Sequence, residues 1–261
     1  MPDRKRPAII AANWKMYKTI EEGISFIKEL SSRVSDLNNN VRVLIAVPFT
    51  ALEKAAVQAK DTPLEIGAQN MHDADQGAFT GEIAAEMLVE AGARFVLLGH
   101  SERRHVFNES SSFINSKVKK ALQTKLCPVV CVGETLEERE AGKSKETVTA
   151  QLEETLEGIA PQKGDALIFA YEPVWAIGTG KTATAEQAQE MHGMIRGWLK
   201  DKWGQEAADS LAILYGGSVK PDNVKELLEQ PDVDGVLVGG ASLYVDSFNK
   251  IIHYQNVGSP S

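Results

Sequence analysis

The sequence predicts an α/β protein in which eight parallel strands close into a (β/α)8 barrel with helices on the outside. Three observations support this prediction. Short, continuously apolar runs recur along the 261 residues, with amphipathic segments between them. The runs do not alternate apolar with polar residues, which indicates strands covered on both faces, as in a parallel sheet. Each run is followed by a polar or glycine-rich segment, and these strand ends are where barrels carry functional groups.

The apolar runs are the predicted strands. The run 64–68 fits the pattern least well. In chain order the predicted strands cover residues 8–12, 41–47, 64–68, 95–98, 128–132, 166–170, 212–215 and 235–238.

Amphipathic segments between the runs predict the helices. The clearest extends from Thr184 to Trp203, with apolar residues and His192 recurring on one stripe at helical spacing. Another helix is expected to open near Pro221 and Asp222, since proline and an acid are favourable in a first turn. A third follows Gly81 and is marked by Ile83, Met87 and Leu88. Strand and helix alternation fits an open sheet as well, but only in a closed barrel do all eight strand ends converge on one mouth.

Composition limits the possible partners and the location. The net charge is −8 with acids and bases interspersed, which argues against nucleic-acid binding. The basic cluster Arg4-Lys5-Arg6 is expected to be a solvated tail. No segment resembles a signal peptide, and no run approaches the roughly 18 apolar residues of a membrane helix, so we expect a soluble, cytoplasmic protein that binds no membrane.

The domain organisation and the cysteines are simple. No linker composition interrupts the chain, which predicts a single barrel domain over residues 1–261 with polar tails at roughly 1–6 and 255–261. Cys127 and Cys131 are the cysteines of the chain, and on one short strand they lie too far apart to bridge each other. We expect both to be core thiols, and no metal site is predicted.

The strand ends bring together residues suited to proton transfer next to a carbonyl group. Glu172 follows an apolar run and can act as the base, with the stiff Pro173 and a glycine-rich lid after it. His100 precedes a short predicted helix whose amide groups disfavour imidazolium, so a neutral ring could donate a hydrogen bond to the oxyanion. Lys15 adds a positive charge and Asn13 a neutral donor at the first strand end. Each of these residues alone has a structural explanation, and their convergence favours the catalytic one.

Glycine-rich turns predict an anion site at the same mouth. Gly216-Gly217-Ser218 and Gly239-Gly240 end the last two predicted strands, where many barrels bind phosphate. Gly178 in the lid could supply a further backbone donor. A small phosphorylated carbonyl compound would fit this mouth.

Five ordered segments of the chain carry a family resemblance. They are Asn13-Trp14-Lys15-Met16, Gly99-His100-Ser101-Glu102-Arg103-Arg104, the stretch from Ala170 to Lys181, Tyr215-Gly216-Gly217-Ser218-Val219 and the stretch from Leu237 to Leu243. These segments resemble the signature segments of the triosephosphate isomerase family, which has the TIM barrel fold, and the resemblance extends from about Ala8 to about Ile252. It implies the interconversion of dihydroxyacetone phosphate and D-glyceraldehyde 3-phosphate through an enediol, in glycolysis and gluconeogenesis, without metal or cofactor.

The resemblance also implies roles for individual residues. Glu172 would be the base, His100 the neutral electrophile, and Lys15 and Asn13 would hold substrate and charge. Phosphate binding carries over to Gly178, Ser218, Gly239 and Gly240, and supporting positions to Ser101 and Glu102.

A homodimer is implied as well. The loop from Gln69 to Glu82 resembles a segment that enters a pocket of the neighbouring subunit, so that Thr80 would lie near the partner's Asn13 and the partner's Lys15.

Two alternatives remain open at this point. Another phosphate-binding barrel enzyme, such as an indole or aldol-type lyase, would share the anion site, but a Schiff-base aldolase needs a lysine inside the barrel and the apolar runs contain none. A catalytically silent barrel serving as a binding or scaffold protein would be expected to lose Glu172, His100 or a lid residue, and all are present.

Overall fold

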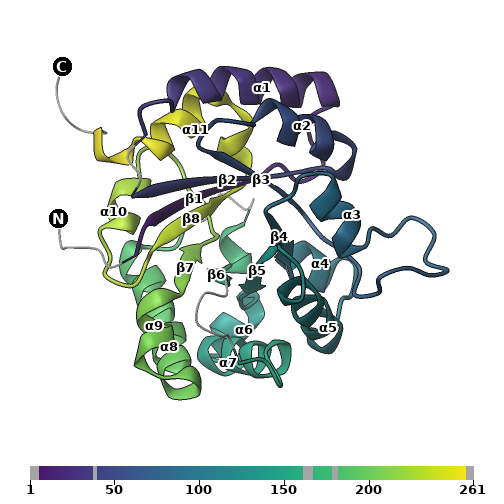
Figure 1. The fold of residues 1–261 in the computed structure, drawn as a ribbon. Helices are drawn as coiled ribbons and strands as arrows, with labels where there is room; N and C mark the ends of the chain where they lie inside the picture. Colours follow the sequence, from purple (N-terminus) through teal and green to yellow (C-terminus); the bar gives the residue numbers. More distant parts are fainter. Residues whose placement is uncertain (1–5, 38–39, 161–166, 178–181, 257–261) are drawn as a thin grey trace.

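A computed structural model describes residues 6–37, 40–160, 167–177 and 182–256. Within them, eight parallel strands form a closed barrel in sequence order, with β8 pairing with β1 (Figure 1). The predicted fold class is confirmed. The strands are β1 (Ala8–Asn13), β2 (Val41–Val47), β3 (Leu64–Ala68), β4 (Phe95–Leu98), β5 (Cys127–Val132), β6 (Ile168–Tyr171), β7 (Ala212–Tyr215) and β8 (Gly235–Val238).

The bounds of three strands differ from the prediction. β1 continues to Asn13 and β5 begins at Cys127, one residue beyond the apolar run in each case. β6 lies at Ile168–Tyr171 instead of 166–170, and residue 166 is outside the described part of the chain. The reason is register, because Tyr171 pairs with both Val132 of β5 and Tyr215 of β7. Glu172 therefore follows the strand directly.

The helices surround the barrel (Figure 1). They are α1 (Ile20–Arg33), α2 (Leu52–Gln58), α3 (Ala85–Glu90), α4 (Ser101–His105), α5 (Ser111–Leu122), α6 (Leu136–Glu140), α7 (Ser144–Thr155), α8 (Ala185–Trp203), α9 (Gln205–Ser210), α10 (Val224–Leu228) and α11 (Val245–Ile252), with 3-10 turns η1 (Phe49–Ala51), η2 (Val174–Ala176), η3 (Gly240–Leu243) and η4 (Tyr254–Asn256).

The predicted helices are present, with two corrections. α8 follows the predicted segment, and Thr184 is its N-cap in a capping box with Gln187. α10 begins only at Val224, so Pro221 and Asp222 lie in the turn before it. Met87 was expected on the apolar side of α3, but 52% of it is exposed, because this short helix buries Ala85 and Leu88 instead.

Two layers of apolar side chains form the core. Alternate strand residues such as Ile9 and Ala11 point into the barrel, whereas Ile10 and Ala12 pack between the barrel and the helices. Gly67 makes room for the inner layer, because a Cβ there would lie 2.5 Å from the ring of Phe95. This contact explains a glycine within β3.

Both cysteines belong to the inner layer. Cys127 and Cys131 are free and buried, as predicted, and burial raises the pKa of the Cys127 thiol to about 12. These are unreactive core thiols.

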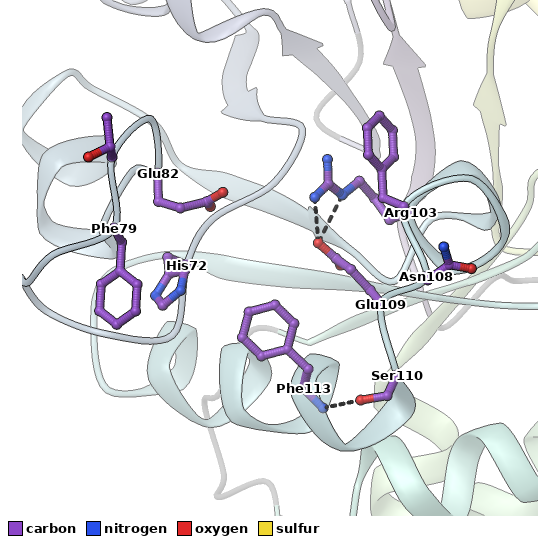
Figure 2. Close-up of a pocket in the computed structure, with 10 residues that line it drawn as sticks. His72, Phe79, Glu82, Arg103, Asn108, Glu109, Ser110 and Phe113 are labelled. Carbon is purple, nitrogen blue, oxygen red and sulfur yellow. Dashed lines mark hydrogen bonds and ion pairs between the residues drawn. The ribbon is translucent and has the colours of Figure 1, made fainter.

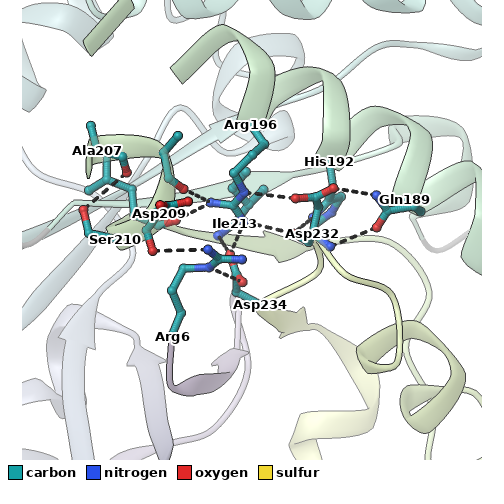
Figure 3. A network of polar contacts seen from close by, with 12 residues as sticks. Arg6, Gln189, His192, Arg196, Ala207, Asp209, Ser210, Ile213, Asp232 and Asp234 are labelled. Atoms are coloured by element: carbon teal, nitrogen blue, oxygen red, sulfur yellow. Dashed lines mark hydrogen bonds and ion pairs between the residues drawn. The ribbon is translucent and has the colours of Figure 1, made fainter. Parts of the chain in front are cut away.

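Arg6 contradicts the expectation of a solvated basic tail. Its Nε donates to Asp234 Oδ1 at 2.6 Å, and its Nη1 donates to the Asp209 carbonyl oxygen at 3.2 Å (Figure 3). Asp234 is buried, and a buried carboxylate needs charged partners, here Arg6 and Arg196. Residues 4 and 5 lie outside the described chain.

Among the described helices, none combines the length and the hydropathy that crossing a bilayer would require.

Candidate active site

The carboxyl ends of the strands surround a cavity of about 390 Å³. Most of the residues predicted from the strand ends line it, although they come from distant parts of the chain. Gly178 lies outside the described residues, and Ser101 and Glu102 lie next to His100 on α4. The predicted residues in the lining are Asn13, Lys15, His100, Glu172, Ser218, Gly239 and Gly240.

Glu172 and His100 are in direct contact at the base of this cavity. His100 Nε2 lies 3.1 Å from Glu172 Oε1, and the backbone N–H of Ser101 donates to Glu172 Oε2 at 2.8 Å. The Glu172 side chain is only 2% exposed. Both carboxylate oxygens are thus held by the first residues of α4 and its N-cap.

The hydrogen bonds of His100 define which ring nitrogen carries the proton. His100 is the N-cap of α4, and its Nδ1 accepts from the backbone N–H of Glu102 at 3.2 Å. Because Nδ1 accepts, the proton of a neutral ring is on Nε2, the atom that faces Glu172. In that tautomer the Nε2–H faces Glu172 within the cavity.

Lys15 is held in an unusual backbone conformation. Its φ is +52°, in the left-handed region that non-glycine residues rarely adopt. The side-chain oxygen of Asn13 accepts from the Lys15 N–H at 2.9 Å, and Gln69 Nε2 donates to its carbonyl oxygen at 2.8 Å. Such strain persists where surrounding contacts over-determine it. Sequence reasoning named Gln69 as the start of the loop expected at a subunit interface, and gave its side chain no role in the site.

The Lys15 ammonium group has one carboxylate partner in the described structure. Its Nζ lies 2.7 Å from Glu102 Oε1, and 24% of the Lys15 side chain is exposed. Glu102, expected from the resemblance as a supporting position, therefore lies beside the lysine. A Cβ on Gly239 would lie 3.7 Å from Lys15 Cε, so the lysine stem passes beside the turn after β8.

The glycine turns after β7 and β8 also line the cavity. Gly240 begins η3, so backbone N–H groups at the start of this turn are not used within it. Ser242 Oγ donates to the carbonyl oxygens of Val238 and Gly239, at 3.0 and 2.7 Å, which holds the turn in place. Asn223 does the same for the other turn by donating to the Ser218 carbonyl oxygen at 3.0 Å. These turns can bind an anion next to Lys15.

Glu134 is a residue of the site region that sequence reasoning missed. It is fully buried, and its carboxylate accepts from the hydroxyl of Tyr171 and from Trp175 Nε1, each at 3.0 Å. Arg139 Nη1 lies 3.3 Å from the same carboxylate. The backbone oxygen of Glu134 also accepts a hydrogen bond from the Val174 N–H at 3.0 Å. Glu134 thus ties the segment after Glu172 to the end of β5, and its position after a strand was the available signal.

In chemical terms the cavity combines a carboxylate, an imidazole, a lysine side chain and glycine-rich turns. This set can remove a proton next to a carbonyl group and stabilise the resulting oxyanion. Within the described ranges, no cluster of three or more His, Cys, Asp or Glu side chains is arranged to hold a metal ion.

Comparison with known proteins gives a consistent result over most of the chain. A family model described as triosephosphate isomerase matches residues 8–255. A triosephosphate isomerase from Protochlamydia amoebophila is 51% identical over 253 residues, which cover 97% of this chain and 95% of that protein. The enzymes of the same name from Chloroflexus aurantiacus and Alkaliphilus metalliredigens are 49% and 47% identical, over 96% and 95% of this chain and 100% of each relative.

Proposed function

The chain belongs to the triosephosphate isomerase family, and from this premise we propose how its own residues perform the reaction. The enzyme interconverts dihydroxyacetone phosphate and D-glyceraldehyde 3-phosphate, a step of glycolysis and gluconeogenesis. The observation that carries the proposal is the 3.1 Å distance between His100 Nε2 and Glu172 Oε1, in a cavity that Lys15 also lines. A silent phosphate-binding barrel is not favoured, since the relatives are named as isomerases.

Glu172 carries the proton between the two carbons. Its carboxylate removes a proton from C1 of dihydroxyacetone phosphate, the electrons of the C–H bond form the C1–C2 double bond, and the carbonyl electrons move to O2. The Nε2–H of His100 donates to O2 as charge develops there. The O1 hydroxyl proton then passes to O2, Glu172 returns its proton to C2, and the electrons left on O1 form the new C1=O1 carbonyl of the aldehyde.

The carboxylate has to move before it can act. Ser101 N–H and His100 Nε2 now occupy its two oxygens, at 2.8 and 3.1 Å. A substrate carbonyl that accepts from His100 takes away one of these partners. Glu172 is then free to turn toward the carbon atoms, so substrate binding and placement of the base are coupled.

The phosphate group is assigned to the turns after β7 and β8, next to Lys15. Gly239, Gly240 and the Ser218 turn supply neutral donors, and Lys15 supplies the cation that neutralises the anion. In our proposal the lid that begins at Pro173 adds Gly178 and excludes water, because an enediolate in a wet site could eliminate phosphate.

Replacing Glu172 tests the assignment. In a coupled assay with glyceraldehyde 3-phosphate the wild-type protein should turn over, and Glu172→Gln should lower kcat by on the order of 10² to 10⁴, with substrate affinity much less affected. A near wild-type rate in this variant would remove Glu172 from the mechanism. Absence of turnover in the wild-type protein would favour the silent barrel instead.

We also propose a homodimer that uses the loop from Gln69 to Glu82. This loop extends away from the barrel in Figure 1, and its residue Phe79 is 48% exposed. The ring of His72 packs on Phe79 with centroids 4.3 Å apart, and a cavity of about 480 Å³ lies between this loop and the segment after α4 (Figure 2). Val106 and Phe107, on that segment, expose 66% and 60%. Exposed apolar side chains gathered in this way are typical of a subunit interface.

A charge placed on the loop tests the dimer. Thr80→Arg should shift the protein from dimer to monomer in light scattering at micromolar concentration, because an arginine would be buried without a partner. Gln58→Arg, at the end of α2, is the control and should leave the mass unchanged. A wild-type monomer would refute the proposed dimer.

We place the enzyme in the cytoplasm, the compartment of glycolysis.

A further inference from the structure

We propose that Gln151 is a positioning residue for the base, because its side-chain amide holds Gly133, on which the backbone of Glu172 rests. The inference deepens the proposed function and relies on it. Gln151 lies on the outer helix α7 and does not line the cavity.

The amide of Gln151 makes two hydrogen bonds to one residue. Its Oε1 accepts from the Gly133 N–H at 2.9 Å, and its Nε2 donates to the Gly133 carbonyl oxygen at 2.9 Å. Gly133 is buried and is the first residue after β5. Buried backbone groups need partners, and here one side chain supplies both.

Gly133 is in close contact with the base. A Cβ at this position would lie 1.8 Å from the carbonyl oxygen of Glu172, so the two backbones touch. On either side of Gly133, the Val132 oxygen accepts from Glu172 N–H at 2.8 Å and the Glu134 oxygen accepts from Val174 N–H at 3.0 Å. The residues Val132 to Glu134 therefore hold the backbone from Glu172 to Val174, and Gln151 holds Gly133, the central residue of the three.

The same support includes the start of the lid. Glu134, the neighbour of Gly133, accepts from Trp175 Nε1 at 3.0 Å. A shift of Gly133 would therefore displace the base and the anchor of the lid together. Displacement of a reacting group by about 1 Å can cost up to about 10²-fold in rate.

A purely structural role is the competing explanation, and the two differ in what they predict. If Gln151 only satisfies buried backbone groups, its loss should lower the melting temperature and leave kcat unchanged. If it positions Glu172, kcat should fall while KM and the Kd for inorganic phosphate stay nearly constant, since neither Gln151 nor Gly133 lines the cavity that holds the phosphate turns.

The test uses Gln151→Met, which keeps the length of the side chain and removes both hydrogen bonds. We expect kcat to fall by about 10- to 100-fold, with KM and phosphate affinity changed less than about 3-fold, and with more methylglyoxal formed per turnover. In Gln151→Glu the carboxylate can still accept from Gly133 N–H but cannot donate to its oxygen. Its kcat relative to wild type should recover as the pH is lowered from about 8 to about 6, because a protonated carboxyl group donates again.

Gln189 offers a matched control at the opposite end of the barrel. It makes an equivalent pair of hydrogen bonds to Asp232, with Nε2 donating to Oδ2 at 2.6 Å and Oε1 accepting from the backbone N–H at 3.0 Å (Figure 3). Gln189→Met should lower the melting temperature and leave kcat unchanged.

The outcomes separate the inference from the function on which it rests. An active wild type together with an unimpaired Gln151→Met would overturn the inference alone. An inactive wild type would overturn the proposed function and this inference with it. If Gln151→Met does not fold, Gln151→Glu decides, and a pH profile of kcat parallel to that of the wild type overturns the inference.

Discussion

His192 should make the stability of the protein depend on pH between neutral and weakly acidic conditions. It lies on α8 and is fully buried, with its ring 5.8 Å from the ring of Tyr171 and 6.4 Å from that of Tyr215. Its Nδ1 is 3.2 Å from the Asp232 carbonyl oxygen, and its Nε2 has no hydrogen-bond partner in the described part of the chain. Burial lowers the pKa of His192 from 6.5 to about 4.

The magnitude and the sign follow from proton linkage. Above pH about 6.5 the His192 ring is neutral in both the folded and the unfolded chain, so its protonation does not reduce the free energy of unfolding. As the pH falls below that value the unfolded chain binds a proton that the folded protein does not. The free energy of unfolding therefore decreases down to the folded pKa of about 4. At about 1.4 kcal/mol per pH unit the full loss is about 3 kcal/mol.

Urea unfolding at fixed protein concentration, followed from pH about 7.5 to about 4.5, measures this effect. Other groups titrate in the same range, so the informative quantity is the difference between wild type and His192→Gln, which should lose most of the dependence. His253→Gln is the control, because His253 is only partly buried and should keep the wild-type profile. An NMR titration that gives His192 a pKa near 6.5, or equal pH profiles for wild type and His192→Gln, would refute the reasoning.

Three further substitutions test separate parts of the structure. Lys15→Ala should weaken inorganic phosphate binding by about tenfold or more and slow turnover, since the cation beside Gly239 is lost, and unchanged affinity in calorimetry would contradict the assignment. Glu134→Gln should lower the free energy of unfolding by about 1–3 kcal/mol, because the hydrogen bond from Trp175 loses its charged acceptor. A decrease of less than about 0.5 kcal/mol in urea unfolding would show that the contact of Glu134 with Trp175 does not stabilise the fold. Arg6→Gln should lower the free energy of unfolding by about 1–2 kcal/mol in the same urea experiment and leave kcat unchanged, because the charge of Asp234 then has fewer partners. An unchanged free energy of unfolding would show that the contact of Arg6 with Asp234 contributes nothing to stability.

Much of the fold and of the candidate site could be predicted from local patterns. Continuously apolar runs are required wherever a strand is covered on both faces, so the strands were located to within about two residues. Convergence of the strand ends in a barrel predicts that Asn13, Lys15, His100 and Glu172 surround one mouth, and all four line the cavity. Helix caps such as Thr184 are local signals as well.

The misplaced residues depend on partners that are distant in the sequence. Arg6 was expected in solvent, but Asp234 lies 228 positions away, and only the closure of β8 on β1 brings the two together. Met87 has helical spacing with Leu88, yet the short helix α3 leaves its side chain exposed. Neither outcome follows from the residues around it.

The sequence by itself determined the barrel, the identities of the residues at its mouth and the family, because apolar periodicity and short ordered segments are local properties of the chain. Tertiary structure decided how these residues are held. The left-handed backbone of Lys15, the contact of His100 Nε2 with Glu172 and the contact of Gly133 with the base each require atoms from another strand end, helix or turn to lie within hydrogen-bond or van der Waals distance. Distances of this kind come from packing in three dimensions, which no local pattern encodes.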